Sequence, residues 1–160
     1  MPEEKIYYKS EIGIIEIRAT DNSISKIDFI DEEPLEFISE SNNSCLNECL
    51  KQLTEYFAGK RKDFSLNLAP IGTDFEKRVW QELIKIPFGE TISYLQLAER
   101  LENKKAIRAV GRANGKNRLA IIIPCHRVIG SNGSLTGYAG GLWRKEWLLK
   151  HEGSRQATLW

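Results

Sequence analysis

The segment IPCHRVIG places a thiol, an imidazole and a guanidinium side by side after an apolar run. We predict that residues 120–123 form a buried strand, which leaves its sheet at Pro124 because proline cannot donate a ladder hydrogen bond. Cys125 is then the first accessible residue. A thiol becomes nucleophilic when a base or a cation stabilises its thiolate, and His126 and Arg127 are the adjacent candidates. The pattern fits reactive cysteine chemistry, but also the commoner case of a buried cysteine beside a surface histidine.

A glycine-rich loop, SNGSLTGYAGG, follows at residues 131–141. Its glycines expose backbone N–H groups and Tyr138 offers a flat ring, so the loop is suited to binding a planar heterocycle through its backbone. The same glycines would also suit a plain connecting loop. A thiol, a base and such a loop, together with the cationic helix predicted below for residues 104–117, favour covalent chemistry on a nucleobase.

The charge of the chain is strongly asymmetric although its net value is only +1. Residues 1–50 hold 4 basic and 12 acidic side chains, whereas residues 103–145 hold nine Lys or Arg and no Asp or Glu. A basic part of this kind indicates a polyanionic partner. A solvated basic face that pairs with the acidic N-terminal part is the alternative.

The segment 104–117, KKAIRAVGRANGKN, is predicted to be a helix with cations along one face. Lys104, Arg108 and Arg112 recur every four residues, and small residues such as Ala106 and Ala109 lie between them. Small residues allow close approach and a row of cations requires an anionic surface, so we predict a helix that lies in a DNA groove.

The rest of the chain divides into an alternating first part and a helical second part. Residues 5–31 alternate apolar and polar side chains around turns, which predicts a small antiparallel sheet, and residues 45–57 show the spacing of a helix. A last strand followed by a linker is expected at 61–72. Thr73 and Glu76 have the spacing of a capping box that begins a helix, and a second short helix follows. We therefore predict an α+β protein with domains at 1–70 and 71–160.

Composition sets further limits on the class of protein. The three cysteines, Cys45, Cys49 and Cys125, are odd in number, which indicates a reducing compartment, and the first two fit core packing better than a metal site. There is no apolar run of the ~20 residues that a membrane helix needs, and the N-terminus has no signal-like pattern. We expect a cytoplasmic protein that does not bind membranes.

Several of these motifs together resemble the O6-alkylguanine-DNA alkyltransferases, also called methylated-DNA–protein-cysteine methyltransferases. The resemblance rests on SYLQLAERL, RAVGRANGKN, IPCHRVIG and TGYAGGLWRKEWLLKHEG, and it covers roughly residues 73–153. It implies a small ribonuclease-H-like α/β domain at the N-terminus and a winged helix-turn-helix domain that carries the active site. It further implies direct-reversal DNA repair on O6-alkylguanine, with O4-alkylthymine as a second candidate substrate.

The resemblance implies a catalytic role for five residues. Cys125 would take the alkyl group after His126 removes its proton through a water, and Glu152 would orient His126. Asn117 would hold the turn beneath the reactive segment. Tyr94 would protonate guanine N3 as the product leaves.

The resemblance also implies how double-stranded DNA is bound, from the minor groove with the damaged base flipped out. Arg108 would fill the gap that the base leaves. The DNA-contacting residues would be Ser93, Tyr94, Lys104, Lys105, Ala106, Arg108, Ala109 and Arg112, and the base pocket would consist of Cys125, Val128, Tyr138 and Ala139. The transfer would be irreversible, with one turnover per molecule. We expect a monomer with no cofactor and no metal.

Two other functions compete with this interpretation. A non-catalytic winged-helix DNA-binding protein would bind DNA through the same basic helix and keep Cys125 as a structural residue. A cysteine hydrolase would use Cys125 and His126 repeatedly on an ester or amide, and would leave the basic helix without a purpose.

Overall fold

The computed structural model describes residues 3–154, and within them the chain forms two compact units. The first unit contains residues 3–71 together with 118–120, and the second contains residues 72–117 and 121–154. The sequence places the domain boundary after residue 70 and does not anticipate that residues 118–120 belong to the first unit. Within residues 3–154, no helix has the length and apolar character needed to cross a membrane.

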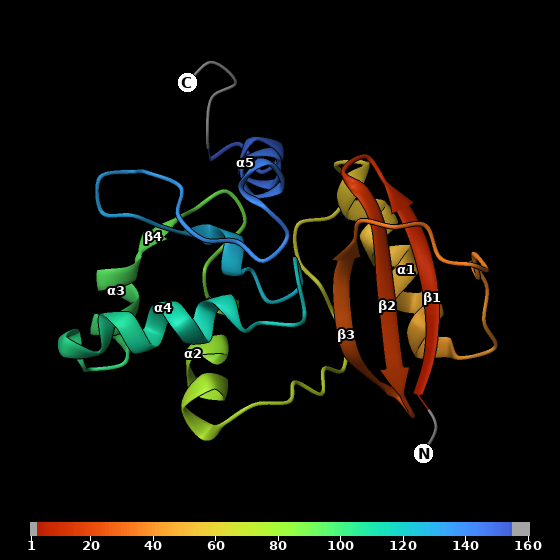
Figure 1. Ribbon diagram of the computed structural model, residues 1–160, viewed down its shortest axis with the longest axis horizontal. Helices are drawn as coiled ribbons and strands as arrows, with labels where there is room; N and C mark the ends of the chain where they lie inside the picture. The colour runs from red at the N-terminus through yellow and green to blue at the C-terminus, as the bar shows by residue number, and fades with distance from the viewer. Residues whose placement is uncertain (1–2, 155–160) are drawn as a thin grey trace. The chain divides into compact units, whose positions relative to one another are not determined.

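The first unit is built on a three-stranded antiparallel sheet (Figure 1). Its strands are β1 (Glu3–Ser10), β2 (Gly13–Thr20) and β3 (Ser23–Ile30), in that order across the sheet. Ile6, Ile17 and Ile27 face one another across the three strands and all are buried. The small antiparallel sheet predicted for residues 5–31 is therefore confirmed, although the central strand β2 is buried without interruption from Ile14 to Ile17.

The sheet is covered by α1 (Ser44–Phe57), which begins at the side-chain cap of Asn43 (Figure 1). The oxygen Oδ1 of Asn43 accepts from the backbone N–H groups of Cys45 and Leu46, which would otherwise lack partners. The helix packs its apolar face on the sheet and ends before Gly59, whose φ of +76° suits glycine. The prediction of a last strand at 61–72 is wrong. That segment contributes only a parallel bridge between Leu68 and Ile24, because Pro70 and Gly72 interrupt it.

The second unit is mainly helical. It contains α2 (Asp74–Ile84), β4 (Ile92–Ser93), α3 (Tyr94–Arg100), η1 (Lys104–Ala106), α4 (Ile107–Gly115), η2 (Cys125–Arg127), β5 (Val128–Ile129) and α5 (Leu142–His151). Helices α2, α3 and α4 pack together (Figure 1). The predicted capping box of Thr73 and Glu76 is present at the start of α2, and the indole N–H of Trp80 from α2 donates to the carbonyl of Ala113 on α4 at 2.8 Å.

Two local predictions in the second part of the chain are wrong. Residues 120–123 form turns rather than a strand, and Ile121 has a φ of +73°, although Ile121, Ile122 and Ile123 are buried as expected. A residue in the left-handed conformation cannot continue a strand, so these isoleucines are buried without forming one. The sequence also predicts that Leu95, Leu97 and Ala98 all face inward, but Leu95 is 38% exposed, whereas Leu97 and Ala98 are buried.

Candidate functional site

Cys125, His126 and Arg127 form one turn of 3-10 helix, η2, directly after Pro124. The chain thus bends at once after Pro124, whereas in an extended segment neighbouring side chains would point to opposite sides. The turn lets His126 and Arg127 reach the same carboxylate, that of Glu152 at the C-terminal end of α5. Sequence spacing could not have paired Glu152 with His126, since 26 positions separate them.

The carboxylate of Glu152 accepts buried hydrogen bonds from His126 and Arg127. His126 Nε2 lies 2.8 Å from Oε2, Arg127 Nε lies 2.8 Å from Oε1, and Arg127 Nη2 lies 3.0 Å from Oε2. The remaining nitrogen, Nη1, donates to the carbonyl of Ile86 at 2.6 Å. Burial by itself raises the pKa of Glu152, but His126 and Arg127 outweigh it and hold the pKa well below its ordinary value. Glu152 is therefore ionised at neutral pH.

An ionised carboxylate only accepts hydrogen bonds, so His126 must carry a proton on Nε2 when it contacts Glu152. Burial lowers the pKa of His126, Glu152 acts against this, and the charges of Arg127 and Lys145 lower it further. The imidazole is thus neutral at pH 7, and its Nδ1 is a lone-pair acceptor. Within residues 3–154 this buried Nδ1 has no hydrogen-bond partner, which is the state that a general base requires.

The Cys125 thiol is buried, with 7% of the residue exposed, so the expectation that it lies in the open is wrong. Burial raises the pKa of the thiol, while a hydrogen bond with Asn117 and the positive charge of Lys145 act in the opposite direction. The Asn117 amide also donates to the Ile123 carbonyl at 2.8 Å and so fastens the turn that precedes the cysteine. Arg127, which the sequence offers as the stabilising cation, is instead engaged by Glu152.

Lys145 is the residue that the sequence reasoning missed. It is completely buried on α5, and its Nζ donates to the carbonyl of Thr136 at 2.9 Å and lies 5.9 Å from the ring centre of Tyr94. A signal was available in the sequence. Lys145 and Glu152 are seven residues apart and share the buried face of α5 with Leu148 and Leu149, so two charged residues occupy core positions. Buried charges at such positions indicate a polar site.

Tyr94 is brought to the site by the short parallel pair of β4 and β5. Ser93, the last residue of β4, pairs with Ile129 and also caps α3, so Tyr94 begins that helix beside η2. The Tyr94 hydroxyl donates to the carbonyl of Thr136 at 3.2 Å, the same oxygen that Lys145 contacts. Burial raises the pKa of Tyr94, and its hydrogen bonds lower it only in part.

The residues predicted to contact DNA lie on η1, on α4 and at the start of α3. Lys104, Lys105, Arg108 and Arg112 are exposed, and the side chains of Ser93, Tyr94, Ala106 and Ala109 are partly exposed. The exposed cations lie on one segment, but the single helix predicted for residues 104–117 is divided into the 3-10 turn η1 and α4, so Lys104 precedes the α-helix that carries Arg108 and Arg112. Ala113, one of the small residues of the same segment, instead packs into the core against Trp80.

The residues predicted to form the base pocket differ in their exposure to solvent. Val128 and Cys125 are buried, Tyr138 is half-buried, and Ala139 is exposed within a turn.

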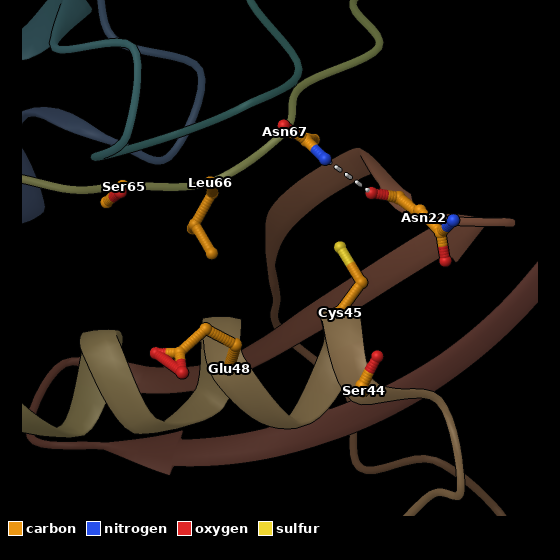
Figure 2. A pocket seen from close by; sticks show the side chains of 7 residues that line it. All are labelled: Asn22, Ser44, Cys45, Glu48, Ser65, Leu66 and Asn67. Atoms are coloured by element: carbon orange, nitrogen blue, oxygen red, sulfur yellow. Dashed lines mark hydrogen bonds between the residues drawn. The ribbon is translucent and has the colours of Figure 1, made fainter.

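A separate pocket of about 440 Å³ lies in the first unit, between α1 and residues 65–67 (Figure 2). Cys45 lines it, and burial raises the pKa of that thiol with no cation acting against it, so this cysteine is not activated. Within residues 3–154, no group of three or more His, Cys, Asp and Glu side chains is arranged to hold a metal ion.

The fold and the site define a helix-turn-helix protein in which a buried cysteine is followed by a histidine that a glutamate orients. Two family models match the chain: "6-O-methylguanine DNA methyltransferase, ribonuclease-like domain" over residues 5–70, and "6-O-methylguanine DNA methyltransferase, DNA binding domain" over residues 74–154. The chain belongs to the 6-O-methylguanine DNA methyltransferase family. The predicted fold class, with its ribonuclease-like and DNA-binding domains, is confirmed.

Individual relatives agree with the family models. The methylated-DNA–protein-cysteine methyltransferase of Methanosarcina acetivorans is 47% identical over 150 residues, which are 92% of this chain and 96% of the relative. The constitutive enzyme of Bacillus subtilis is 48% identical over 126 residues, 78% of this chain and 76% of the relative. Among solved structures, the O6-methylguanine methyltransferase of Mycobacterium tuberculosis superposes with a TM-score of 0.85 at 38% identity, covering 98% of this chain and 96% of that one. The same protein in complex with DNA gives a TM-score of 0.84 at 39% identity, covering 96% of this chain and 95% of that one.

Proposed function

We propose that this chain repairs O6-alkylguanine in double-stranded DNA by transferring the alkyl group to Cys125. The observation that carries the proposal is the buried contact of His126 with Glu152, which leaves the Nδ1 of the residue after Cys125 as an acceptor. Family membership supports the reaction, and the exposed cations of η1 and α4 support a DNA partner.

The reaction consists of one displacement and two proton transfers. His126 Nδ1 accepts the thiol proton of Cys125 through a water, and Asn117 and Lys145 stabilise the resulting thiolate. The sulfur then attacks the alkyl carbon, the bond from that carbon to O6 breaks, and its electron pair stays on the guanine. Tyr94 donates its proton to guanine N3, so that a neutral guanine leaves.

A base inside a duplex is out of reach of a buried sulfur, so the damaged nucleotide must leave the stack. Extrusion costs a few kcal/mol, and we assign the compensating contacts to Arg108 in the gap and to backbone groups at Cys125, Val128 and Ala139. The product on Cys125 is a thioether, which has no good leaving group. Each molecule therefore reacts once.

Intact-protein mass spectrometry after incubation with a duplex that contains O6-methylguanine tests the proposal. We expect one methyl increment per molecule, mapped to Cys125, with no further increase at excess DNA. Cys125→Ser should abolish the increment, and Cys45→Ser is the matched control that should keep it. DNA binding without any increment would support the non-catalytic winged-helix protein, and repeated turnover of an ester without an increment would support a hydrolase.

A further inference from the structure

The chain contains two Asn-Gly pairs, and the structure places them in opposite environments. Asn132 and Gly133 lie in a turn at the start of the glycine-rich loop, where Asn132 is exposed to solvent. Asn114 and Gly115 end α4, and Asn114 is buried, with 3% of the residue exposed. Neither asparagine takes part in the reaction described above. The two pairs therefore present the same functional groups in different surroundings.

An Asn-Gly pair can convert itself to an acid without an enzyme. The backbone nitrogen of the glycine loses its proton to base and attacks the side-chain carbonyl carbon of the asparagine. A carbon–nitrogen bond forms, the bond from that carbon to the side-chain nitrogen breaks, and ammonia leaves behind a cyclic imide. Water then opens the imide at either of its carbonyls, which gives aspartate or isoaspartate. Glycine favours the attack because it has no side chain to hinder it.

The turn around Asn132 holds the two reacting groups close together. Gly133 has a φ of +83°, its N–H donates to the Gly130 carbonyl at 2.9 Å, and the Gly130 N–H donates to the Ser134 carbonyl at 2.9 Å, as in a three-residue hairpin loop. The Ser134 N–H donates to Asn132 Oδ1 at 3.1 Å, which folds the Asn132 side chain over the next peptide and polarises its carbonyl. Attack therefore requires a local opening of this surface turn and no exposure of core residues.

Asn114 is protected from the same reaction by its surroundings. It lies in the last turn of α4, and its Nδ2 donates to the Cys125 carbonyl at 3.4 Å in the protein interior. Its side chain would have to leave the interior and the end of the helix would have to unwind before the attack. This opening costs far more free energy than the opening of a surface turn. The structure thus predicts that the two pairs react at very different rates in the folded chain.

We propose that Asn132 is a site of spontaneous deamidation and that the isoaspartyl form of the protein transfers alkyl groups slowly. Isoaspartate lengthens the main chain by one carbon before Gly133, so the pairing of Gly130 with Ser134 cannot be kept. The first part of the inference stands on the turn alone, and the second part rests on the proposed function. Because each molecule is proposed to react once, a molecule that waits for a lesion is also one that ages.

The turn is coupled to the proposed site by the residues that follow it. The carbonyl of Thr136, two residues beyond Ser134, accepts hydrogen bonds from the Tyr94 hydroxyl at 3.2 Å and from Lys145 Nζ at 2.9 Å. A shifted main chain at 130–134 therefore displaces an anchor of the proposed proton donor and of the buried ammonium. Aspartate in place of Asn132 keeps the length of the main chain and an oxygen for the Ser134 N–H, so it leaves this anchor in place.

The test of the first part follows the purified chain during incubation at mildly alkaline pH, with a reducing agent that protects the thiols. Peptide mass spectrometry detects each conversion as the replacement of an amide by an acid, and chromatography separates aspartate from isoaspartate. We expect conversion at Asn132 to be at least about tenfold faster than at Asn114, because local opening is easier there, and to accelerate with pH. Equal rates at the two pairs, or no conversion at Asn132, would overturn the first part.

The test of the second part gives samples from this incubation a short pulse of duplex that contains O6-methylguanine. We expect the fraction of molecules methylated at Cys125 to fall in step with the isoaspartyl fraction. Asn132→Ser is the matched control, because serine cannot form the imide and keeps a hydroxyl oxygen for the Ser134 N–H. It should keep its activity through the incubation, and freshly prepared Asn132→Asp should react as fast as the unsubstituted chain.

Three results would overturn the second part. They are full activity in the isoaspartyl fraction, a loss of activity in Asn132→Ser as fast as in the unsubstituted chain, and a freshly prepared Asn132→Asp that is as slow as the isoaspartyl form. Failure of the fresh, unsubstituted chain to accept a methyl group at Cys125 would instead overturn the proposed function. The rates of conversion at Asn132 and Asn114 do not depend on that outcome, so the two failures are distinguishable.

Discussion

Replacing Glu152 by alanine should have two effects that can be separated by a second substitution. The carboxylate holds two hydrogen bonds from Arg127 and one from His126, all buried. Removing it leaves the Arg127 guanidinium buried with the Ile86 carbonyl and the Phe88 ring as neighbours but without its counter-charge, and breaking a buried ion pair from one side costs about 3–5 kcal/mol. It also leaves His126 without its orienting group, which should slow methyl transfer by about 10²-fold or more.

Arg127→Met in the Glu152→Ala background tests this reasoning, because it removes the stranded charge and leaves His126 unoriented. We expect the double variant to regain about 2 kcal/mol of unfolding free energy and no activity, since replacing both partners of a buried pair by apolar groups is far less costly than removing one. Urea unfolding measures the first effect, and mass spectrometry of methyl transfer the second. Glu146→Ala is the control, because Glu146 pairs with Lys150 across one turn of the same helix, an interaction worth about 0.5 kcal/mol. If the two substitutions simply add, or if activity returns with stability, the account of the network is wrong.

Three further predictions concern pH, DNA binding and helix capping. Burial places the pKa of His126 below its ordinary value of 6.5, so the unfolded chain binds a proton at a higher pH than the folded chain does. The unfolding free energy should therefore fall as the pH drops below about 6.5. His126→Gln should remove this contribution to the pH dependence, which urea unfolding at several pH values measures. Arg112→Ala should weaken DNA binding with little dependence on sequence and make the plot of log affinity against log salt less steep by about one, because Arg112 is exposed on α4, and an unchanged slope would exclude a phosphate contact by Arg112. Thr73→Ala removes the capping box of α2 and should cost about 1 kcal/mol of unfolding free energy, against no loss for a substitution at the exposed Gln81.

Local patterns in the sequence predicted those parts of the structure that depend on neighbouring residues. The alternation of β1–β3 and the capping box of α2 are examples, because period and capping are properties of short segments. The turn at 120–123 was missed because burial of three isoleucines is compatible with a strand, and only the φ of Ile121 shows otherwise.

The residues of the site could be predicted only in part from local patterns, because some of them reach it through tertiary packing. The motif around Cys125 is contiguous and could be recognised, but Glu152 and Lys145 reach it only through the packing of α5, which no spacing rule specifies. Resemblance to a family supplied Glu152, whereas the place of Lys145 follows from its burial and its hydrogen bond alone.

The three residues Arg118–Ala120 limit the modularity of the helical unit. They group with the sheet unit, where the Ile27 amide donates to the Arg118 carbonyl at 2.8 Å and the Ala120 amide donates to the Ile27 carbonyl at 3.1 Å. A fragment that starts at residue 72 would contain residues 118–120 but not β3. Leu119, which is buried in the sheet unit, would then be exposed, and the Arg118 carbonyl and the Ala120 amide would lose their hydrogen bonds to Ile27, only a few positions before Cys125. A minimal alkyl acceptor cut from this chain would therefore need a substitute for β3, or a redesigned connection between Asn117 and Ile121.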